Sequence, residues 1–375
     1  MPKDYRFSHL SWDGLQGLDV RRKASLFNDG GRPIHTLVAQ QFTRGMLDDL
    51  CGLATRIRRI AKSKDGMHFL NGLLDHKRAM LYFSQPSTRT FLSFYAACQI
   101  IGIKAAEVQD PATSSELKGE SIEDSIRTFS SYFDLLIMRT PQQGLAEHMA
   151  WLLSNTERPV PIINAGSGKD QHPTQALLDI YTLQRSFERL GGIDGKTVVF
   201  VGDLLRGRTV RSLAWLLTNY TDVKQYFVAA KPLQIGEDVL QQLDEAGVKY
   251  EVREDFESVI PEADAIYMTR LQDEWGNVPG AGDKDNGTKY HFRAEHLRLL
   301  KRNAILMHPL PRRKEIAKYA TEGLPRRCRE LIPMHEEAGE ALRALRDPLA
   351  VVGSVDPARL VKALQARGEV VAMTG

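Results

Sequence analysis

Residues 79–91 read AMLYFSQPSTRTF and join an apolar run to a cluster of hydroxyl groups and one guanidinium. The run 79–83 predicts a buried strand, because short apolar segments bounded by turn residues are typical of parallel sheets. From Thr88 onward apolar residues recur at helical spacing, and Gly102 stands where a helix would end. The stretch therefore predicts a strand, a turn and a helix, which is the building unit of an α/β fold.

The first turn of the predicted helix carries Ser87, Thr88, Arg89 and Thr90. The first turn of a helix has backbone N–H groups without intrahelical partners and the positive end of the helix dipole, so it suits an anion. The planar guanidinium of Arg89 matches a phosphate group in particular. A purely structural interpretation is equally open from these residues alone: Ser87 caps the helix and Arg89 lies in solvent.

The same rhythm of apolar runs and amphipathic stretches continues along the chain. Further runs of strand length lie at 135–138, 161–164, 197–201, 226–228, 265–268 and 304–307. We expect an α/β fold of two doubly wound domains, each a mostly parallel sheet with helices on both faces. The length of 375 residues also fits two domains.

Polar motifs follow most of these runs. They are Arg139 after 135–138, HPTQ at 172–175, GD at 202–203 with RGRT at 206–209, TRLQ at 269–272, and HPLPR at 308–312. Open α/β sheets bind ligands at the carboxyl ends of their strands, so we expect these motifs to serve one site. Each motif alone also has a structural explanation, such as an ion pair or an ordinary turn. Together the arginines, histidine and glutamines predict a site for a ligand with several negative charges.

Composition and charge narrow the class of protein. A net charge of +3 is too close to balance to indicate nucleic-acid binding. The sequence contains no apolar run of the roughly 18 residues that a membrane helix needs, and it starts without an apolar signal core. Its three scattered cysteines form neither a disulfide framework nor a metal-ligand cluster. We expect a cytoplasmic protein that contacts neither membrane nor nucleic acid.

The motifs as a set resemble the aspartate/ornithine carbamoyltransferase family over roughly residues 36–320. The residues that carry the resemblance are STRT at 87–90, HPTQALLD at 172–179, VGDLLRGRTVRSL at 201–213, YMTRLQ at 267–272 and HPLPR at 308–312. The last two resemble the aspartate branch. The ornithine branch would be expected to show a Ser-Met-Gly loop and a cysteine in HCLP, and this sequence has neither.

The resemblance implies transfer of the carbamoyl group of carbamoyl phosphate to L-aspartate, as in pyrimidine biosynthesis, without a metal or a cofactor. It also implies a homotrimer with active sites shared between subunits, and it allows regulatory or other enzyme subunits as partners. Two alternatives stay open. The amine acceptor could differ from aspartate, or the chain could be a non-catalytic carbamoyltransferase-like partner subunit.

The resemblance further implies a role for each site residue. Carbamoyl phosphate would be bound by Ser87, Thr88, Arg89, Thr90, Ser114, Arg139, His172, Gln175, Pro309 and Leu310. Aspartate would be bound by Lys118, Arg208, Arg270 and Gln272. The catalytic residues would be Arg89, Thr90, Lys118, Arg139 and His172, with Lys118 reaching in from a neighbouring subunit.

Four segments are expected: an N-terminal extension at 1–35, a carbamoyl-phosphate domain at 36–171, an aspartate domain at 172–333, and an atypical C-terminal segment at 334–375 that packs on the first domain. The loop 273–290 is longer than the resemblance leads us to expect, so it is either a lid or a determinant of acceptor choice. The bond between Leu310 and Pro311 is expected to be cis, because only X-Pro bonds adopt that form at small cost.

Overall fold

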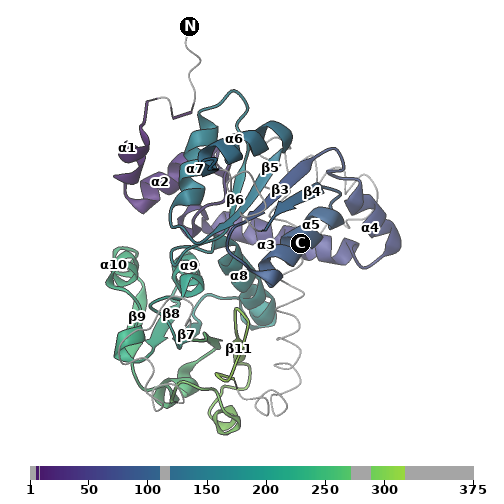
Figure 1. Cartoon of the computed structure of the whole chain (residues 1–375). Helices are drawn as coiled ribbons and strands as arrows, with labels where there is room; N and C mark the ends of the chain where they lie inside the picture. The colour runs from purple at the N-terminus through teal and green to yellow at the C-terminus, as the bar shows by residue number, and fades with distance from the viewer. Residues whose placement is uncertain (1–5, 8, 110–118, 272–288, 317–375) are drawn as a thin grey trace. The chain divides into compact units, whose positions relative to one another are not determined.

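The computed structural model describes residues 6–7, 9–109, 119–271 and 289–316. The chain divides into two compact units after Gly168 (Figure 1). Each unit is built on its own parallel sheet with helices packed against it, which confirms the expected α/β fold. None of the helices in these described ranges is long and apolar enough to cross a membrane.

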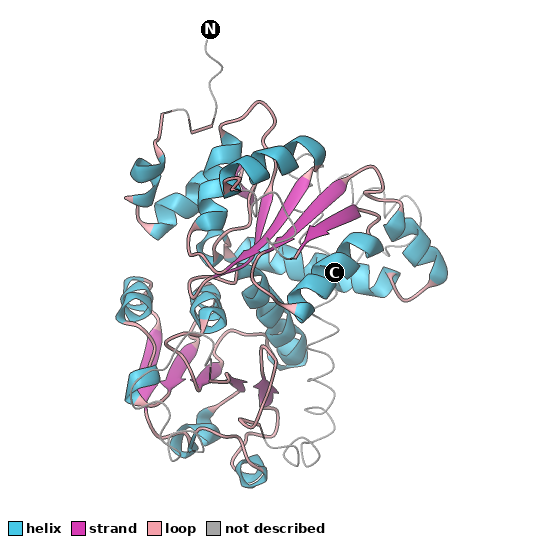
Figure 2. Ribbon diagram, in the orientation of Figure 1, coloured by secondary structure: helices cyan, strands magenta, loops and turns pink. Residues whose placement is uncertain are grey.

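The first unit contains a four-stranded sheet in the order β4-β3-β5-β6, with every neighbouring pair parallel (Figure 2). Its strands are β3 (Arg78–Phe83), β4 (Lys104–Val108), β5 (Leu135–Thr140) and β6 (Ile162–Ser167). Around them lie α1 (Trp12–Gln16), α2 (Val20–Leu26), the hairpin β1 (Asn28–Asp29) and β2 (Arg32–Pro33), η1 (Ala39–Gln41), α3 (Arg44–Ile60), α4 (Lys64–Asn71), α5 (Thr88–Ile100), α6 (Ile122–Tyr132) and α7 (Leu145–Ser154).

Both faces of this sheet are buried because successive side chains of a strand point to opposite faces. Met80 and Tyr82 belong to a cluster with residues of α6 and α7, whereas Leu81 and Phe83 belong to a cluster with residues of α5. The N-terminal extension joins the first cluster through Phe7 and the residues of α1 and α2. These described residues of the extension are therefore part of the core of the first unit.

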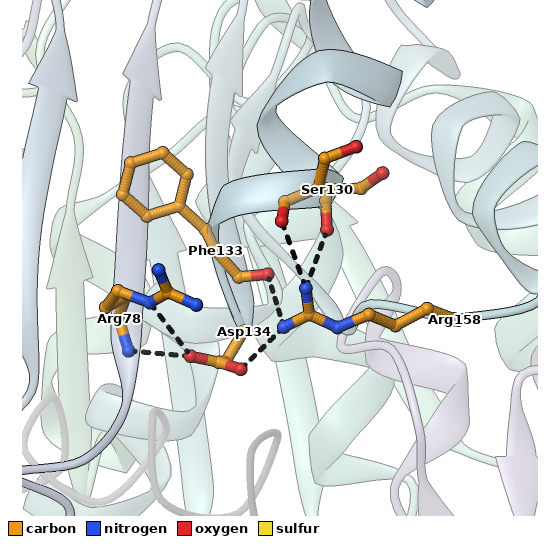
Figure 3. Close-up of polar contacts among 6 residues, drawn as sticks. Arg78, Ser130, Phe133, Asp134 and Arg158 are labelled. Atoms are coloured by element: carbon orange, nitrogen blue, oxygen red, sulfur yellow. Dashed lines mark hydrogen bonds and ion pairs between the residues drawn. The ribbon is translucent and has the colours of Figure 1, made fainter.

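A carboxylate joins the starts of two strands to the end of α6 (Figure 3). Asp134 accepts a hydrogen bond from the backbone N–H of Arg78 at 3.0 Å and another from Arg158 at 2.7 Å. Arg158 also donates to the carbonyl of Ser131, at 3.2 Å, in the last turn of α6. A cation at a helix C-terminus stabilises the unpaired carbonyls there. The cluster therefore fixes the end of α6 near the amino ends of β3 and β5.

The second unit contains a five-stranded parallel sheet in the order β11-β10-β7-β8-β9. Its strands are β7 (Thr197–Val201), β8 (Lys224–Val228), β9 (Lys249–Arg253), β10 (Ala265–Met268) and β11 (Ile305–Met307). Its helical segments are α8 (Pro173–Phe187), η4 (Glu188–Leu190), α9 (Arg208–Leu217), η5 (Lys231–Leu233), α10 (Glu237–Glu245), η6 (Glu257–Glu262) and η8 (Ala294–Arg298).

Here too the sheet is covered on both faces. Val199 and Ile266 lie in a cluster with Val259 and Ile260 of η6. On the opposite face Tyr267 donates a hydrogen bond to Asp179 of α8, and Gln225 donates to the backbone of α9. The expected doubly wound arrangement is thus present in each unit.

Candidate active site

In each sheet the strand order changes direction between two neighbouring parallel strands, which are β3 and β5 in the first unit and β7 and β10 in the second. Sequence motifs follow these strands. In the first unit the chain runs from β3 outward to β4 and then returns to β5 on the other side of β3. In the second it runs from β7 to β8 and β9 and then returns to β10. Loops diverge at such a switch point and leave a crevice, which is where open α/β sheets bind ligands.

At the first switch point, Arg139 is the last residue but one of β5 and lies beside the loop that follows β3. Phe83 and Arg139 are register partners. The carbonyl of Arg139 accepts hydrogen bonds from the backbone N–H of Gln85 at 3.3 Å and from the hydroxyl of Ser84 at 3.4 Å. The buried guanidinium of Arg139 donates to the carbonyl of Ala165 in β6 at 3.0 Å, so the side chain is held in one orientation.

The loop after β3 leads into the first turn of α5, as expected. Ser87 occupies the N-cap position, but its side chain accepts no hydrogen bond from the helix backbone. Its hydroxyl donates instead to the hydroxyl of Thr90 at 3.0 Å. Thr88 and Arg89 are exposed. The helix start therefore offers backbone N–H groups that no cap side chain occupies, together with hydroxyls and a guanidinium that an anion can reach.

At the second switch point, three neighbouring strands present their carboxyl ends side by side. Met268 of β10 pairs with Val201 of β7, and Tyr267 pairs with Met307 of β11. Arg208 follows β7, Arg270 follows β10, and Pro309 and Leu310 follow β11. The sheet thus brings together two half-buried arginines and a pair of backbone carbonyls that lie far apart in the sequence.

The two arginines that follow β7, Arg206 and Arg208, lie in different surroundings. Arg206 is buried and paired with the buried Asp203, with a distance of 2.6 Å between Nη2 and Oδ2. Arg208 is the first residue of α9 and half-buried. A buried guanidinium needs such a carboxylate, because an unpaired charge costs several kcal/mol, on the order of 3–5, to bury. Arg206 therefore stabilises the turn, whereas Arg208 lies at the helix start.

His172 begins α8 with a defined pattern of hydrogen bonds. Its Nδ1 accepts from the backbone N–H of Gln175 at 3.3 Å and lies 3.2 Å from the hydroxyl of Thr174. Because Nδ1 is an acceptor, a neutral imidazole carries its proton on Nε2. The ring can therefore donate a hydrogen bond from Nε2.

The loop after β11 contains the expected cis bond between Leu310 and Pro311. Leu310 has a positive φ of 58°, a conformation that costs a non-glycine residue about 1–3 kcal/mol. The Nδ1 atom of His308 accepts the Leu310 N–H at 2.8 Å. Because the carbonyl of Pro309 lies in the same peptide plane as this N–H, the bond also constrains the direction of that carbonyl.

Three expected site residues, Ser114, Lys118 and Gln272, lie outside the described residues, as do most of the long loop at 273–290 and the whole C-terminal segment at 334–375. Their expected roles stay predictions.

Within the described ranges, one group of side chains has the spacing of a metal site: Glu257, Glu295 and His296. The Nδ1 atom of His296 accepts the backbone N–H of Arg293 at 3.2 Å, so the proton of the neutral ring is on Nε2. That nitrogen faces Glu257 at 3.4 Å and has a proton to donate, rather than a lone pair for a metal. The group therefore suits an ordinary hydrogen bond better than metal binding.

No role was predicted from the sequence for the buried polar residues that support the site, although two of them, Asp179 and Tyr267, lie in the motifs at 172–179 and 267–272. Asp179, Tyr267 and Glu315 are each hydrogen-bonded to a residue of the motifs, and all three are buried. A signal was available for Asp179, since it stands four residues after Gln175 in the same helix and so on the same face.

These observations define a class of protein: a chain of two α/β units, each with a parallel sheet and with arginine or hydroxyl side chains after the strands at its switch point. Comparison with known families agrees. Residues 35–185 match the aspartate/ornithine carbamoyltransferase carbamoyl-P binding domain, and residues 194–328 match the Asp/Orn binding domain of the same family. The chain belongs to the aspartate/ornithine carbamoyltransferase family.

Individual relatives give the same result. Aspartate carbamoyltransferase 3 (chloroplastic) of Pisum sativum is 40% identical over 280 residues, which cover 74% of this chain and 68% of the relative. The aspartate carbamoyltransferase catalytic subunit of Vibrio cholerae is 44% identical over 251 residues, covering 65% and 76%. The solved structure of Trypanosoma cruzi aspartate transcarbamoylase with N-(phosphonacetyl)-L-aspartic acid is 33% identical, with a TM-score of 0.73, and the match covers 87% of this chain and 96% of that one.

The family models and the packing assign α8 differently. The first family model extends to residue 185, whereas α8 packs with the second unit. In particular, the hydroxyl of Ser212 in α9 accepts the backbone N–H of His172 at 3.0 Å and donates to Gln171 at 2.8 Å. These bonds tie the motif at 172–175 to the second unit. The domain limits expected at 35, 171 and 333 remain proposals.

Proposed function

We propose that this chain is an aspartate carbamoyltransferase, which transfers the carbamoyl group of carbamoyl phosphate to the amine of L-aspartate. The products are N-carbamoyl-L-aspartate and phosphate. The observation that carries the proposal is the arrangement of anion-binding groups at both switch points, in a chain whose relatives are named for this reaction. The solved relative with N-(phosphonacetyl)-L-aspartic acid carries a molecule that combines a phosphonate with aspartate.

The first turn of α5 is the proposed phosphate site. Ser87, Thr88, Arg89 and Thr90 would hold the phosphate by backbone N–H groups, hydroxyls and one guanidinium. This role is supported by the exposed positions of Thr88 and Arg89 and by the absence of a capping bond from Ser87. The part of Ser114 in the same site is proposed from the resemblance alone.

The carbonyl group of carbamoyl phosphate gains negative charge as the amine attacks it. Thr90, Arg139 and His172 are the proposed donors to that oxygen. A single donor of this kind typically contributes about 10²- to 10³-fold in rate. The proton that the ring of His172 carries on Nε2 supports its part in this set.

The acceptor half of the site would hold the two carboxylates of aspartate through Arg208, Arg270 and Gln272, with Lys118 contacting both substrates. Gln175 and the carbonyls of Pro309 and Leu310 would accept hydrogen bonds from the carbamoyl amide and the incoming amine. The neutral amine attacks the carbon, the tetrahedral oxyanion collapses, and phosphate leaves with the proton of the amine. Orientation and fixed charge supply most of the acceleration in such a mechanism.

We further propose a homotrimer with shared sites, a cytoplasmic location and a place in pyrimidine biosynthesis. The trimer and the place in pyrimidine biosynthesis rest on the resemblance described above, and the location rests on the composition of the sequence.

The test is an assay of the purified protein with carbamoyl phosphate and a panel of amines, in which the ureido product is measured. Aspartate should be the best acceptor, with ornithine and putrescine far behind, because arginines arranged for two carboxylates repel a cationic side chain. A preference for ornithine would contradict the proposal, and turnover of no amine would favour a non-catalytic subunit.

A further inference from the structure

The carboxylate of Asp179 lies inside the second unit, completely buried, and two side chains donate hydrogen bonds to it. Gln175 Nε2 donates to one oxygen at 3.0 Å, and the hydroxyl of Tyr267 donates to the other at 2.8 Å. Asp179 and Tyr267 have relative exposures of 0%, and Gln175 has 7%. A carboxylate that was neither paired nor hydrogen-bonded would be too costly to bury at this depth.

The bond from Gln175 determines which way its amide faces. The two ends of a glutamine amide are nearly identical in shape but opposite in hydrogen bonding, because Oε1 accepts and Nε2 donates. An ionised carboxylate only accepts, so the reversed amide would place two acceptors against each other. Asp179 therefore keeps the Nε2 atom of Gln175 directed toward its own carboxylate, and the Oε1 atom points away from Asp179.

The other bond holds the carboxylate itself in place. The burial of Tyr267, followed by the nearby charge of Asp179, raises the pKa of its hydroxyl well above its ordinary value, so the hydroxyl keeps its proton and donates it. Thr209, the second residue of α9, donates in turn to the Tyr267 hydroxyl. These hydrogen bonds thus join α8, β10 and α9. Thr209 follows Arg208 directly in the sequence, and Tyr267 precedes the last residue of β10.

We propose that Asp179 is a positioning residue that gives the carbamoyl-phosphate site its preference for a carboxamide, by fixing Gln175 with its oxygen toward the ligand. This inference rests on the proposed function. A carboxamide has an NH₂ group that Oε1 of Gln175 can accept from, whereas a methyl ketone of the same shape has nothing to donate. The site would lose this preference if the amide of Gln175 could turn over.

The test uses two stable phosphonates that differ only in this group. Phosphonoacetamide carries the NH₂, and acetonylphosphonate carries a methyl group in its place. In the unmodified protein, titration calorimetry should find phosphonoacetamide bound at least tenfold more tightly. The Asp179→Asn variant can offer Gln175 either a donor or an acceptor, so the ratio should fall about tenfold, with acetonylphosphonate affinity changed less than threefold. Equal weakening of both ligands, or an unchanged ratio, would overturn the proposal.

Two further variants separate positioning from general damage. In a Gln175→Ala background the ratio should already be low, and adding Asp179→Asn should not lower it further, because the two residues act through one bond. A further fall in that background would show that Asp179 acts by another route. Tyr267→Phe removes the second donor but keeps the bond to Gln175, so it should retain most of the preference.

Neutron diffraction of the unmodified protein with phosphonoacetamide bound gives an answer that does not depend on any variant folding. Deuterium on the Gln175 nitrogen should face Asp179, and the Gln175 oxygen should face the NH₂ of the ligand. The reverse orientation would overturn the proposal. The wild-type assay with carbamoyl phosphate and aspartate tests the proposed function separately: the enzyme can turn over these substrates whether or not Asp179 determines the ratio.

Discussion

The imidazole of His308 lies with its Nε2 atom 2.8 Å from the carboxylate of Glu315, and both side chains are buried. The Nδ1 atom of the same ring accepts the N–H of Leu310, so Nε2 carries the proton and donates it to Glu315. Burial opposes the charge on Glu315, but hydrogen bonds from His308 and from the backbone N–H of Arg313 outweigh it and lower the pKa of Glu315 to about 2. The carboxylate is therefore ionised at neutral pH and fixes the ring that holds the loop.

The first prediction is that Glu315→Ala lowers kcat/KM about 10- to 100-fold. The loss of the buried hydrogen-bond partner of His308 costs about 1–3 kcal/mol, and the carbonyls of Pro309 and Leu310 are then no longer held in one orientation. Glu315→Gln keeps an acceptor for His308 and should lose clearly less. Glu237→Gln, at an exposed carboxylate of α10, is the matched control and should behave as the unmodified protein. Steady-state kinetics measure all three, and equal losses in the alanine and glutamine variants would contradict the role of the charge-assisted bond.

The second prediction separates the two ligands at Arg270. Arg270→Ala should raise the KM for aspartate about 100-fold, because the proposed arginine–carboxylate pair would be lost, and change carbamoyl-phosphate binding less than threefold. The exposed Arg302, in the same unit, provides the control in Arg302→Ala, which should leave both values unchanged. If both ligands weaken to the same extent, Arg270 does not belong to the acceptor half.

The third prediction concerns the close approach of two strand ends. Gly202 has a φ of +115°, and a Cβ atom there would lie 2.3 Å from the carbonyl oxygen of Thr269. Gly202→Ala should therefore lower the free energy of unfolding by about 3 kcal/mol, because it combines backbone strain with a clash against backbone. Gly52→Ala, in the middle of α3, meets nothing within 4 Å and should raise stability by about 0.5–1 kcal/mol.

Urea unfolding monitored by circular dichroism measures both glycine variants. A Gly202→Ala protein as stable as the unmodified one would show that β7 and β10 can separate without cost.

The fourth prediction is a loss of stability in acid caused by His35. Its Nδ1 accepts the N–H of Ile162 at 3.1 Å and its Nε2 lies 3.0 Å from the hydroxyl of Ser154, so the ring fits only in its neutral form. Burial, followed by the positive charge of Arg6, lowers the pKa of His35 from 6.5 to about 3. The unfolded chain takes up this proton below pH 6.5 and the folded chain does not, so stability should fall as the pH drops from 6.5 toward 3.

The contribution of one such group cannot exceed about 1.4 kcal/mol per pH unit. Urea titrations between pH 7.5 and pH 4 should show that His35→Gln has a smaller dependence on pH than the unmodified protein, by up to that slope. Parallel curves for the two proteins would mean that other groups cause the acid sensitivity.

The fifth prediction tests the proposed sharing of sites between subunits. Arg89→Ala and Lys118→Ala should each be nearly inactive, yet regain activity when their subunits are dissociated and reassembled together. Interfaces in a cyclic trimer are heterologous, so random mixing should make about one site in four intact. Failure to recover activity despite subunit exchange, measured by mass spectrometry of labelled chains, would rule out the shared site.

The sequence by itself determined the fold class and the positions of most strands along the chain. The runs at 79–83, 197–201 and 265–268 all lie within strands of the structure, because a strand buried on both faces must be apolar at every position. It did not reveal β4 and β9, which lie at sheet edges and are partly exposed, so their mixed polarity resembles that of loops. Motifs after strands were likewise visible, because strand ends collect ligand-binding residues regardless of how the sheet is ordered.

Only the tertiary structure decided which polar residues support those motifs. The order β11-β10-β7 brings Leu310, Arg270 and Arg208 to neighbouring strand ends, and no local pattern contains that order. The supporting roles of Asp179 and Glu315 depend on which groups donate to them, and one donor to Asp179, Tyr267, is 88 positions away in the sequence. A local sequence motif can identify a side chain that faces a ligand. The residue that orients this side chain is identified only by the three-dimensional packing.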